Sequence, residues 1–200
     1  MKYILGIDEA GRGPLAGPVA VGVVATLKDF DLLAAFPGLN DSKKLSEKKR
    51  EFLFARLQEE MRVGNVRAVV CLSSAEVIDT KGISYAISHA LTQGVRKLMP
   101  DPALGKIYLD GSLKAPAEYE QETIIGGDAT VPAIMLASVA AKVTRDRLMV
   151  KIAGEQPQYG FEKHKGYGTA SHIQAIHTYG ISPIHRVSFL SRIVGATILP

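Results

Sequence analysis

The sequence predicts an α/β protein with a five-stranded mixed sheet flanked by helices and followed by a helical C-terminal region. Five short runs rich in aliphatic and β-branched residues recur along the 200 residues, as expected of buried strands. The first three runs are arranged so that they could form a meander, whereas helical patterns separate the third, fourth and fifth, which favours a mixed sheet. The predicted strands cover residues 3–7, 19–26, 65–72, 106–110 and 120–127.

The first half of the chain alternates these strands with turns and helices. A turn rich in glycine and proline, residues 14–18, joins the first two strands and predicts that they pair antiparallel. Residues 28–37 lack periodicity and predict a loop. A helix is predicted from Ser46, because Leu53, Leu57 and Met61 recur every four residues.

The second half contains three further helical patterns. Ser73 and Glu76 form a capping-box pattern with Ser73 as the N-cap, and the helix behind it is interrupted near Gly82 and ends near Met99. A long helix over 131–153 has a first half that is apolar almost all round, which predicts burial. One shorter helix is expected near residues 171–178. We expect one structural domain, with a core over residues 1–155 and a helical or loop segment over 156–200 that leans over one edge of the sheet.

Composition restricts the class of protein. Lys and Arg number 24 against 20 acidic residues, a net charge of +4 that suits a polyanionic partner without establishing one. The single cysteine, Cys71, excludes an internal disulfide framework, and its apolar neighbours predict a buried side chain. No signal peptide and no apolar run of about 18 residues is found, so we expect a cytoplasmic protein that does not enter a membrane.

Carboxylates follow three of the predicted strands. Asp8 and Glu9 end the first strand, Asp110 ends the fourth, and Asp128 follows the fifth. Brought to one edge of a sheet, four carboxylates would repel one another unless cations lay between them, and such oxygen ligands suit Mg²⁺ or Mn²⁺ beside a phosphate. Neighbouring residues of a regular strand face opposite sides. We therefore expect the chain to leave regular strand geometry at Asp8 and Glu9.

Two other interpretations of the opening stretch are simpler. The acids could end the strand in a solvated turn, although three strand ends of the same kind argue against this. Residues 11–16 also fit the dinucleotide-binding pattern G-x-G-x-x-A, but two prolines and a second strand follow where that motif needs a helix. We therefore favour the metal site.

The remaining ionisable residues are expected to be structural. The five histidines show no metal-ligand spacing. Asp146 lies between Arg145 and Arg147 on a helix, which favours an ion pair there over a catalytic role. Glu120 and Glu122 are expected on an exposed face of the fifth strand.

Several motifs together resemble the ribonuclease HII family. They appear in the family's order and span nearly the whole chain, and no catalytic position is missing. The matching segments are GIDEAGRGPLAGP at 6–18, NDSKKLS at 40–46, LDG at 109–111, GD at 127–128, ASVAAKVTRD at 137–146, HKGYGT at 164–169 and HRVSF at 185–189.

The resemblance implies a fold, an activity and a catalytic set. It implies a ribonuclease H-like fold and cleavage of the RNA strand of RNA–DNA hybrids. It also implies cutting on the 5′ side of single ribonucleotides in duplex DNA, which leaves a 5′-phosphate. Asp8, Glu9, Asp110 and Asp128 match the family's catalytic carboxylates, which would hold two Mn²⁺ or Mg²⁺ ions.

The resemblance also implies substrate-binding residues. Gly11, Arg12 and Gly13 match the loop that senses the 2′-hydroxyl, and Tyr167 matches the aromatic residue that packs against the next sugar. The segment from Asn40 to Lys44 supplies further contacts, of which we name Asn40, Ser42, Lys43 and Lys44, with the lysines following the phosphates. Lys43 and Lys44 could equally be a solvated helix entry.

The expected ligands are an RNA–DNA hybrid and ribonucleotide-containing duplex DNA, and we expect a monomer. The alternative function is a non-catalytic nucleic-acid-binding module of the same fold. Four carboxylates beside a polyanion would oppose binding in such a module, which favours the enzyme.

Overall fold

The computed structural model describes residues 2–190 and contains the predicted five-stranded mixed sheet. The strand order is β3-β2-β1-β4-β5, in which β1, β2 and β3 pair antiparallel while β1, β4 and β5 run parallel. All five predicted strands are confirmed, although β1 extends further than expected and β5 is shorter. Their bounds are β1 Tyr3–Ala10, β2 Val19–Leu27, β3 Val66–Ser73, β4 Gly105–Asp110 and β5 Gln121–Ile124.

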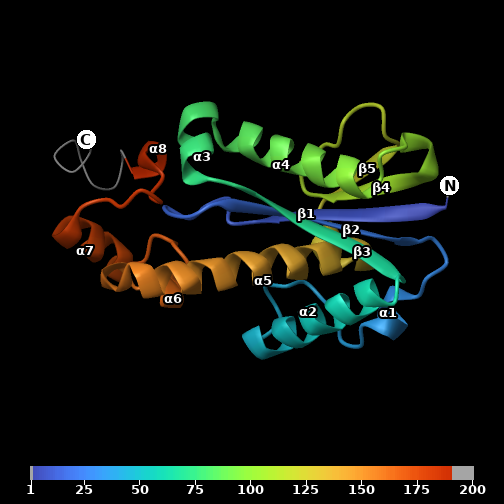
Figure 1. The fold of residues 1–200 in the computed structure, drawn as a ribbon, viewed down its shortest axis with the longest axis horizontal. Coiled ribbons are helices and arrows are strands. Elements are labelled where there is room, and N and C mark those ends of the chain that lie inside the picture. Colours follow the sequence, from blue (N-terminus) through green and yellow to red (C-terminus); the bar gives the residue numbers. More distant parts are fainter. Residues whose placement is uncertain (1, 191–200) are drawn as a thin grey trace.

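Helices cover both faces of this sheet (Figure 1). On one face α4 packs on β2 and β3 over an apolar core, with α3 before it. On the other face α5 packs on β1 and β2, with α1 and α2 outside it. The bounds are α1 Leu32–Ala35, α2 Glu47–Arg62, α3 Ala75–Lys81, α4 Ile83–Leu98, α5 Pro132–Glu155, α6 Phe161–His164, α7 Ala170–Tyr179 and α8 Val187–Leu190. No helix among residues 2–190 is long and apolar enough to cross a membrane.

Three local predictions are wrong. Residues 28–37 include the short helix α1, whose N-cap Asp31 accepts a hydrogen bond from the Ala34 amide. Ser74 caps α3, because Ser73 is still paired within β3. Cys71 is half-buried, since β3 is the last strand of the sheet on its side, and partial burial raises the pKa of its thiol.

Helix α5 lies unusually close to the sheet. A Cβ atom added to Gly6 would lie 2.0 Å from the carbonyl carbon of Ala133, and one added to Gly22 would lie 2.2 Å from the carbonyl oxygen of Ala137. Any side chain at these two positions would push the helix away. The predicted burial of the first half of α5 is confirmed, and this close packing is the reason for it.

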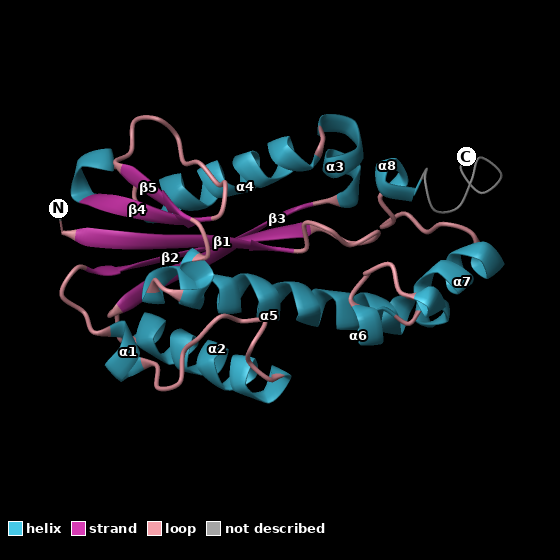
Figure 2. Cartoon of the chain, turned by 180° about the vertical axis from the view of Figure 1, so that it is seen from behind, coloured by secondary structure: helices cyan, strands magenta, loops and turns pink. Residues whose placement is uncertain are grey.

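The C-terminal region extends beyond the end of β1, where α6, α7 and α8 gather (Figures 1 and 2). It is tied to the turn after β1 by backbone hydrogen bonds from the Leu15 amide to the Gly166 carbonyl and from the Gly17 amide to the Ile184 carbonyl. Ala16 and Met149 share a small apolar core with Tyr159 and Phe161 of this region. The predicted boundary at residue 155 coincides with the end of α5, but the division itself stays a prediction. Residues 191–200 of the predicted segment lie outside the described residues.

Candidate active site

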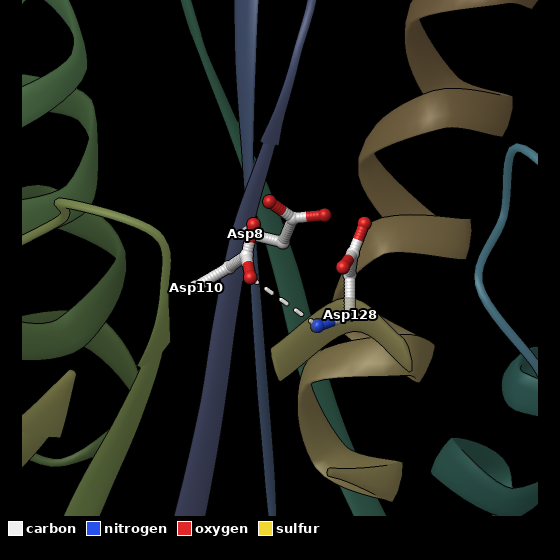
Figure 3. A group of neighbouring side chains, drawn as sticks. All are labelled: Asp8, Asp110 and Asp128. Carbon is white, nitrogen blue, oxygen red and sulfur yellow. Dashed lines mark hydrogen bonds between the residues drawn. The ribbon is translucent and has the colours of Figure 1, made fainter. Parts of the chain in front are cut away.

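Three aspartates converge at one edge of the sheet (Figure 3). Asp8 lies on β1 and Asp110 ends the neighbouring parallel strand β4, where Ile7 is paired with Leu109. Asp128 lies in the 3₁₀ turn η2, Gly127–Ala129, just before α5, and its amide donates to Asp110 Oδ1 at 3.3 Å. Each aspartate offers a carboxylate oxygen within 4.8 Å of those of the other two. Such a group of hard oxygen donors fits a divalent cation.

Charge repulsion and burial act together on this cluster. Asp8 is only 4% exposed, and its burial raises the pKa of its carboxyl to about 7, with the negative charges of Glu9 and Asp110 acting in the same direction. Hydrogen bonds from Ser138 and from the Glu9 amide oppose that rise. Among residues 2–190 the only cation paired with the three aspartates is Lys43, whose Nζ lies 2.9 Å from Asp128 Oδ2. The cluster therefore carries more negative charge than the protein neutralises.

Glu9 does not join the three aspartates. Strand β1 keeps regular pairing through Glu9 and Ala10, so the expected departure from strand geometry is wrong. Asp8 shares a face with Gly6, which packs on α5, and Glu9 alternates to the face of α4. The Glu9 carboxylate instead accepts a hydrogen bond from Arg12 Nη1 at 3.0 Å. A role for Glu9 in holding ions stays a prediction.

The two glycines around Arg12 serve different purposes. Gly11 is buried with φ +88°, and a Cβ atom there would lie 2.0 Å from Nε of Arg145. Gly13 has no such constraint, since a Cβ atom would meet nothing within 4 Å. Gly11 is therefore required by packing, and the side of Gly13 that lacks a side chain faces open space.

Arg145 of α5 supports this turn from beneath and was not recognised as a site residue from the sequence. It is 1% exposed and donates from Nε to the Pro18 carbonyl, from Nη2 to Ala16 and from Nη1 to Lys165, at 2.9–3.0 Å. It thus connects the turn after β1 to the loop before Tyr167. Burial lowers the pKa of its guanidinium.

Arg186 supports the same turn from the C-terminal region. It is fully buried and donates to the carbonyls of Gly17, Arg12 and Gly11 at distances of 2.7–3.0 Å. Burial, followed by the charge of Arg145, lowers the pKa of Arg186 to about 9. All six hydrogen bonds of the two arginines end on backbone carbonyls, so no acceptor side chain in the sequence indicates these contacts.

Asp146 forms the predicted ion pair with Lys142 and not with either neighbouring arginine. Lys142 Nζ lies 2.9 Å from Asp146 Oδ1, one turn earlier on α5. Arg147 instead bonds Glu51 of α2. Arg145 does not pair with Asp146, because its guanidinium already donates to three backbone carbonyls.

Tyr167 lies in the loop between α6 and α7 with 45% of its surface exposed. Its amide donates to the His164 carbonyl and its carbonyl accepts from Nδ1 of His172, both at 2.9 Å. The backbone of Tyr167 is thus fixed while its ring remains accessible to solvent. The turn after β1 connects this loop to the strand that carries Asp8.

Three buried histidines brace this loop. Gly166 donates its amide to His164 Nδ1, so the ring proton of His164 lies on Nε2 and is donated to Tyr159. His172 uses Nδ1 for Tyr167, which leaves its Nε2 to accept from Nε2 of His185 at 3.1 Å. Each ring then carries one proton, and burial lowers the pKa of His172 and of His185 to about 4.

The segment after Asn40 has both buried and exposed members. Ser42 is buried and its Oγ lies 2.7 Å from Oγ of Ser138, which in turn bonds Asp8. Ser42 therefore supports the aspartate cluster through Ser138, a residue that the sequence analysis did not single out. Asn40 and Lys44 are exposed, and Asn40 accepts from the Asp41 amide at 2.8 Å.

The fold and the aspartate cluster define the class of protein. A five-stranded mixed sheet with helices on both faces and three aspartates at one edge is the arrangement of a metal-dependent nuclease with a ribonuclease H-like fold. The family model described as Ribonuclease HII matches residues 5–192. The chain belongs to the ribonuclease HII family, and it is therefore a metal-dependent endoribonuclease that acts on RNA–DNA hybrids.

Individual relatives agree with this assignment. A ribonuclease HII from Endomicrobium trichonymphae is 48% identical over 93% of this chain and 84% of its own length. The ribonuclease HII in the structure of its complex with PCNA from Archaeoglobus fulgidus is 26% identical, with a TM-score of 0.73 over 92% of this chain and 91% of that one. The ribonuclease H2 from Pyrococcus horikoshii has the same fold, with a TM-score of 0.74 over 96% and 97% of the two chains at 24% identity.

Proposed function

We propose that this enzyme cuts RNA in RNA–DNA hybrids and also cuts on the 5′ side of single ribonucleotides in duplex DNA, by hydrolysis that uses two Mn²⁺ or Mg²⁺ ions. The observation that carries the proposal is the convergence of Asp8, Asp110 and Asp128 with insufficient positive charge to balance them. When bound, the ions would supply an activated water and stabilise the leaving 3′ oxygen.

The protein's own part in the reaction is to hold the ligands in place. Ser138 and the Glu9 amide fix the Asp8 carboxylate, and the Asp128 amide fixes Asp110. Glu9 lies on the neighbouring position of β1, and we propose that it contributes to the metal site after releasing Arg12. Lys43 balances part of the charge of Asp128. When ions neutralise Asp128 instead, Lys43 can contact a phosphate.

Recognition of the ribonucleotide is assigned to the segment from Gly11 to Gly13. The carbonyls of Gly11 and Arg12 are already bonded to Arg186, which fixes the orientation of the peptide groups, and the open side of Gly13 allows close approach to a sugar. A 2′-hydroxyl can both donate and accept a hydrogen bond, so a rigid backbone can detect it. Tyr167 would pack its exposed ring against the following sugar, Asn40 and Lys44 would add contacts along the strand, and residues 156–200 would complete the groove.

The test is a cleavage assay with three labelled duplexes: one with a single ribonucleotide in DNA, one RNA–DNA hybrid and one of DNA alone. We expect cutting of the first two with Mg²⁺ or Mn²⁺, none with EDTA, and a 5′-phosphate on the downstream product. Cutting of the hybrid without cutting at a single ribonucleotide would remove the finer proposal. Binding of all three without cleavage would favour the non-catalytic module.

We also propose that Tyr167 distinguishes an isolated ribonucleotide from continuous RNA. A ring packed on a sugar or base is worth about 1–3 kcal/mol by alanine substitution, so Tyr167→Ala would slow cutting at a single ribonucleotide about tenfold and affect continuous RNA less. The measurement is the ratio of the two kcat/KM values in variant and parent.

We further propose that the protein is a monomer located in the cytoplasm, where its one cysteine stays reduced. Light scattering of the purified protein measures its mass and tests whether it is a monomer.

A further inference from the structure

A hollow of about 230 Å³ lies beside the active site on the side of α4. Its rim combines the first turns of α4 with the turn after β4 and with Arg12. Its floor is apolar and belongs to the main core, so its shape is fixed. The polar residues of the rim are Arg12, Ser84, Ser88, Ser112 and Lys114.

The rim offers donors and no carboxylate. Two cations and three hydroxyls face one hollow, and none of its eight lining residues is acidic. Ser84 and Ser88 lie one turn apart on the same side of α4. Within residues 2–190 no hydrogen bond or ion pair engages the side chains of Ser84, Ser88, Ser112 or Lys114. These groups are available to a ligand.

A second hollow differs from this one because its lining contains acidic as well as basic residues. It lies between α2 and α5 and contains Arg50, Arg147 and Lys165, but also Glu47, Glu51 and Asp146. Arg147 there is bonded to Glu51 and has no need of an external anion. In the hollow at Lys114, Arg12 is paired with Glu9 from outside the lining, but Lys114 has no acidic partner among residues 2–190, which favours an anionic ligand.

Its position relates it to the reaction. Ser112 follows the proposed metal ligand Asp110 by two residues, and Arg12 is bonded to Glu9. Asp8 faces α5 and Glu9 faces α4, so the aspartate cluster and this hollow lie around the same edge of the sheet on its two sides. A nucleic-acid strand with one phosphate at the aspartates must place its neighbouring phosphates close by.

We propose that the hollow bordered by Ser84, Ser88, Ser112 and Lys114 is a subsite for one backbone phosphodiester of the bound duplex. Lysine and serine side chains are common partners of phosphate oxygens, and such contacts fix the register of a protein on a duplex. The inference rests on the proposed function, since it takes a nucleic-acid duplex as the ligand. It adds a fixed point outside the cleavage site that aligns the strand.

The test combines Lys114→Ala with a duplex whose phosphates are neutralised one at a time. Duplexes with a single ribonucleotide and one methylphosphonate linkage at successive positions are titrated by fluorescence anisotropy in EDTA, so that binding is measured without cleavage. For the parent, we expect one neutral linkage near the ribonucleotide to weaken binding about fivefold. In Lys114→Ala that same linkage should cost less than about twofold, because the contact is already lost.

Control variants separate the subsite from general charge. Lys28→Ala removes the same charge from an exposed lysine at the opposite edge of the sheet, after the end of β2, and should keep the full penalty of the neutral linkage. The double variant Ser84→Ala with Ser88→Ala should weaken the parent duplex while changing the slope of log Kd against log salt less than Lys114→Ala does, which removes about one unit. All these positions are exposed, so folding is not at risk.

The result that would overturn the proposal is a penalty pattern in Lys114→Ala identical to that of the parent at every linkage. Equal effects of Lys114→Ala and Lys28→Ala on binding would also overturn it. Cleavage of the unmodified duplex by the parent is measured separately with Mg²⁺. If the parent does not cleave this duplex, the proposed function is refuted, but the binding result can still be interpreted.

Discussion

Two charged regions meet near the end of β1, and they are built in opposite ways. In the aspartate cluster three carboxylates converge with Lys43 as their one paired cation among the described residues. In the support beneath the turn, Arg145 and Arg186 are buried without an ion pair in residues 2–190, and backbone carbonyls take all six of their hydrogen bonds. We propose that ions complete the cluster from outside, whereas the arginine support is complete within the protein. Catalysis and rigidity are therefore separable here.

The sharpest way to test the cluster is to remove one charge from it. Asp110→Asn should reduce cleavage by about a thousandfold, equal to about 4 kcal/mol in the barrier, because the ions lose a ligand. The melting temperature of the ion-free protein should stay the same or rise as repulsion falls. The control Asp29→Asn changes an exposed aspartate after β2 and should keep full activity. Cleavage by Asp110→Asn within tenfold of the parent would refute the site.

Removing a buried arginine should destabilise the fold, whereas Asp110→Asn should leave stability the same or raise it. Arg145→Met leaves three carbonyls without their donor and should lower the free energy of unfolding by about 3 kcal/mol or more. Its neighbour Arg147 forms an exposed ion pair with Glu51, so Arg147→Met should cost less than about 1 kcal/mol. Urea unfolding measures both, and adding Mn²⁺ should not restore Arg145→Met. A loss shared equally by the two variants would show that the carbonyl network contributes nothing special.

The two glycines provide a finer comparison. Gly11→Ala should destabilise the protein by about 2 kcal/mol, because the methyl group collides with Arg145 and the backbone has positive φ. Gly13→Ala should change stability by less than about 0.5 kcal/mol and yet lower kcat/KM for a single ribonucleotide about tenfold. Thermal unfolding and the cleavage assay are measured on the same samples. Normal cleavage by Gly13→Ala would return recognition to another part of the chain.

The last effects concern pH, and the aspartate cluster should differ in sign from the buried histidines that brace the loop of Tyr167. The pKa of Asp8 in the folded, ion-free protein is about 7, against an ordinary value of 3.8. Between these values the folded state holds a proton that the unfolded state has lost, so this group lowers stability as pH rises. Asp8→Asn should therefore stabilise the ion-free protein by about 1–3 kcal/mol at pH 8 and by less at pH 5.

The histidines brace the loop of Tyr167 and should act in the other direction. The pKa of His172 and of His185 is about 4 against an ordinary 6.5, so the unfolded state binds more protons between these values. Their contribution to stability is lost as pH falls from about 6.5 to about 4. Urea unfolding of parent and Asp8→Asn in EDTA from about pH 4 to about pH 8 measures both effects. A gain from Asp8→Asn that does not depend on pH would contradict the raised pKa.

The sequence predicted features that repeat along one element or recur at strand ends. Apolar runs and helical periodicity were sufficient for all five strands and the long helices. The convergence of Asp8, Asp110 and Asp128 was expected because each follows a predicted strand, and in the structure Asp8 and Asp110 lie on parallel neighbours. Even the opposite directions of Asp8 and Glu9 follow from strand alternation, and only the added assumption of a distorted strand end was wrong.

Features that depend on tertiary packing against the backbone were not predictable. Arg145 stands beside an aspartate in the sequence, which suggests an ion pair, but its partners are carbonyls more than 120 residues away in two of three cases. Ser138 looks like any small residue of a buried helix, and its contact with Ser42 spans 96 residues. A carbonyl acceptor has no residue type, so such contacts leave no pattern to read.

The close packing of α5 on β1 and β2 has a consequence for how related proteins diverge. Asp128 and Ser138 are carried before and on this helix, and Asp8 is on the strand beneath it, so Gly6 and Gly22 set the spacing between them. A descendant could retain every aspartate and still become inactive if either glycine gained a methyl group. When gene duplicates of this enzyme are sorted into active and silent copies, these two core positions are therefore as informative as the carboxylates themselves.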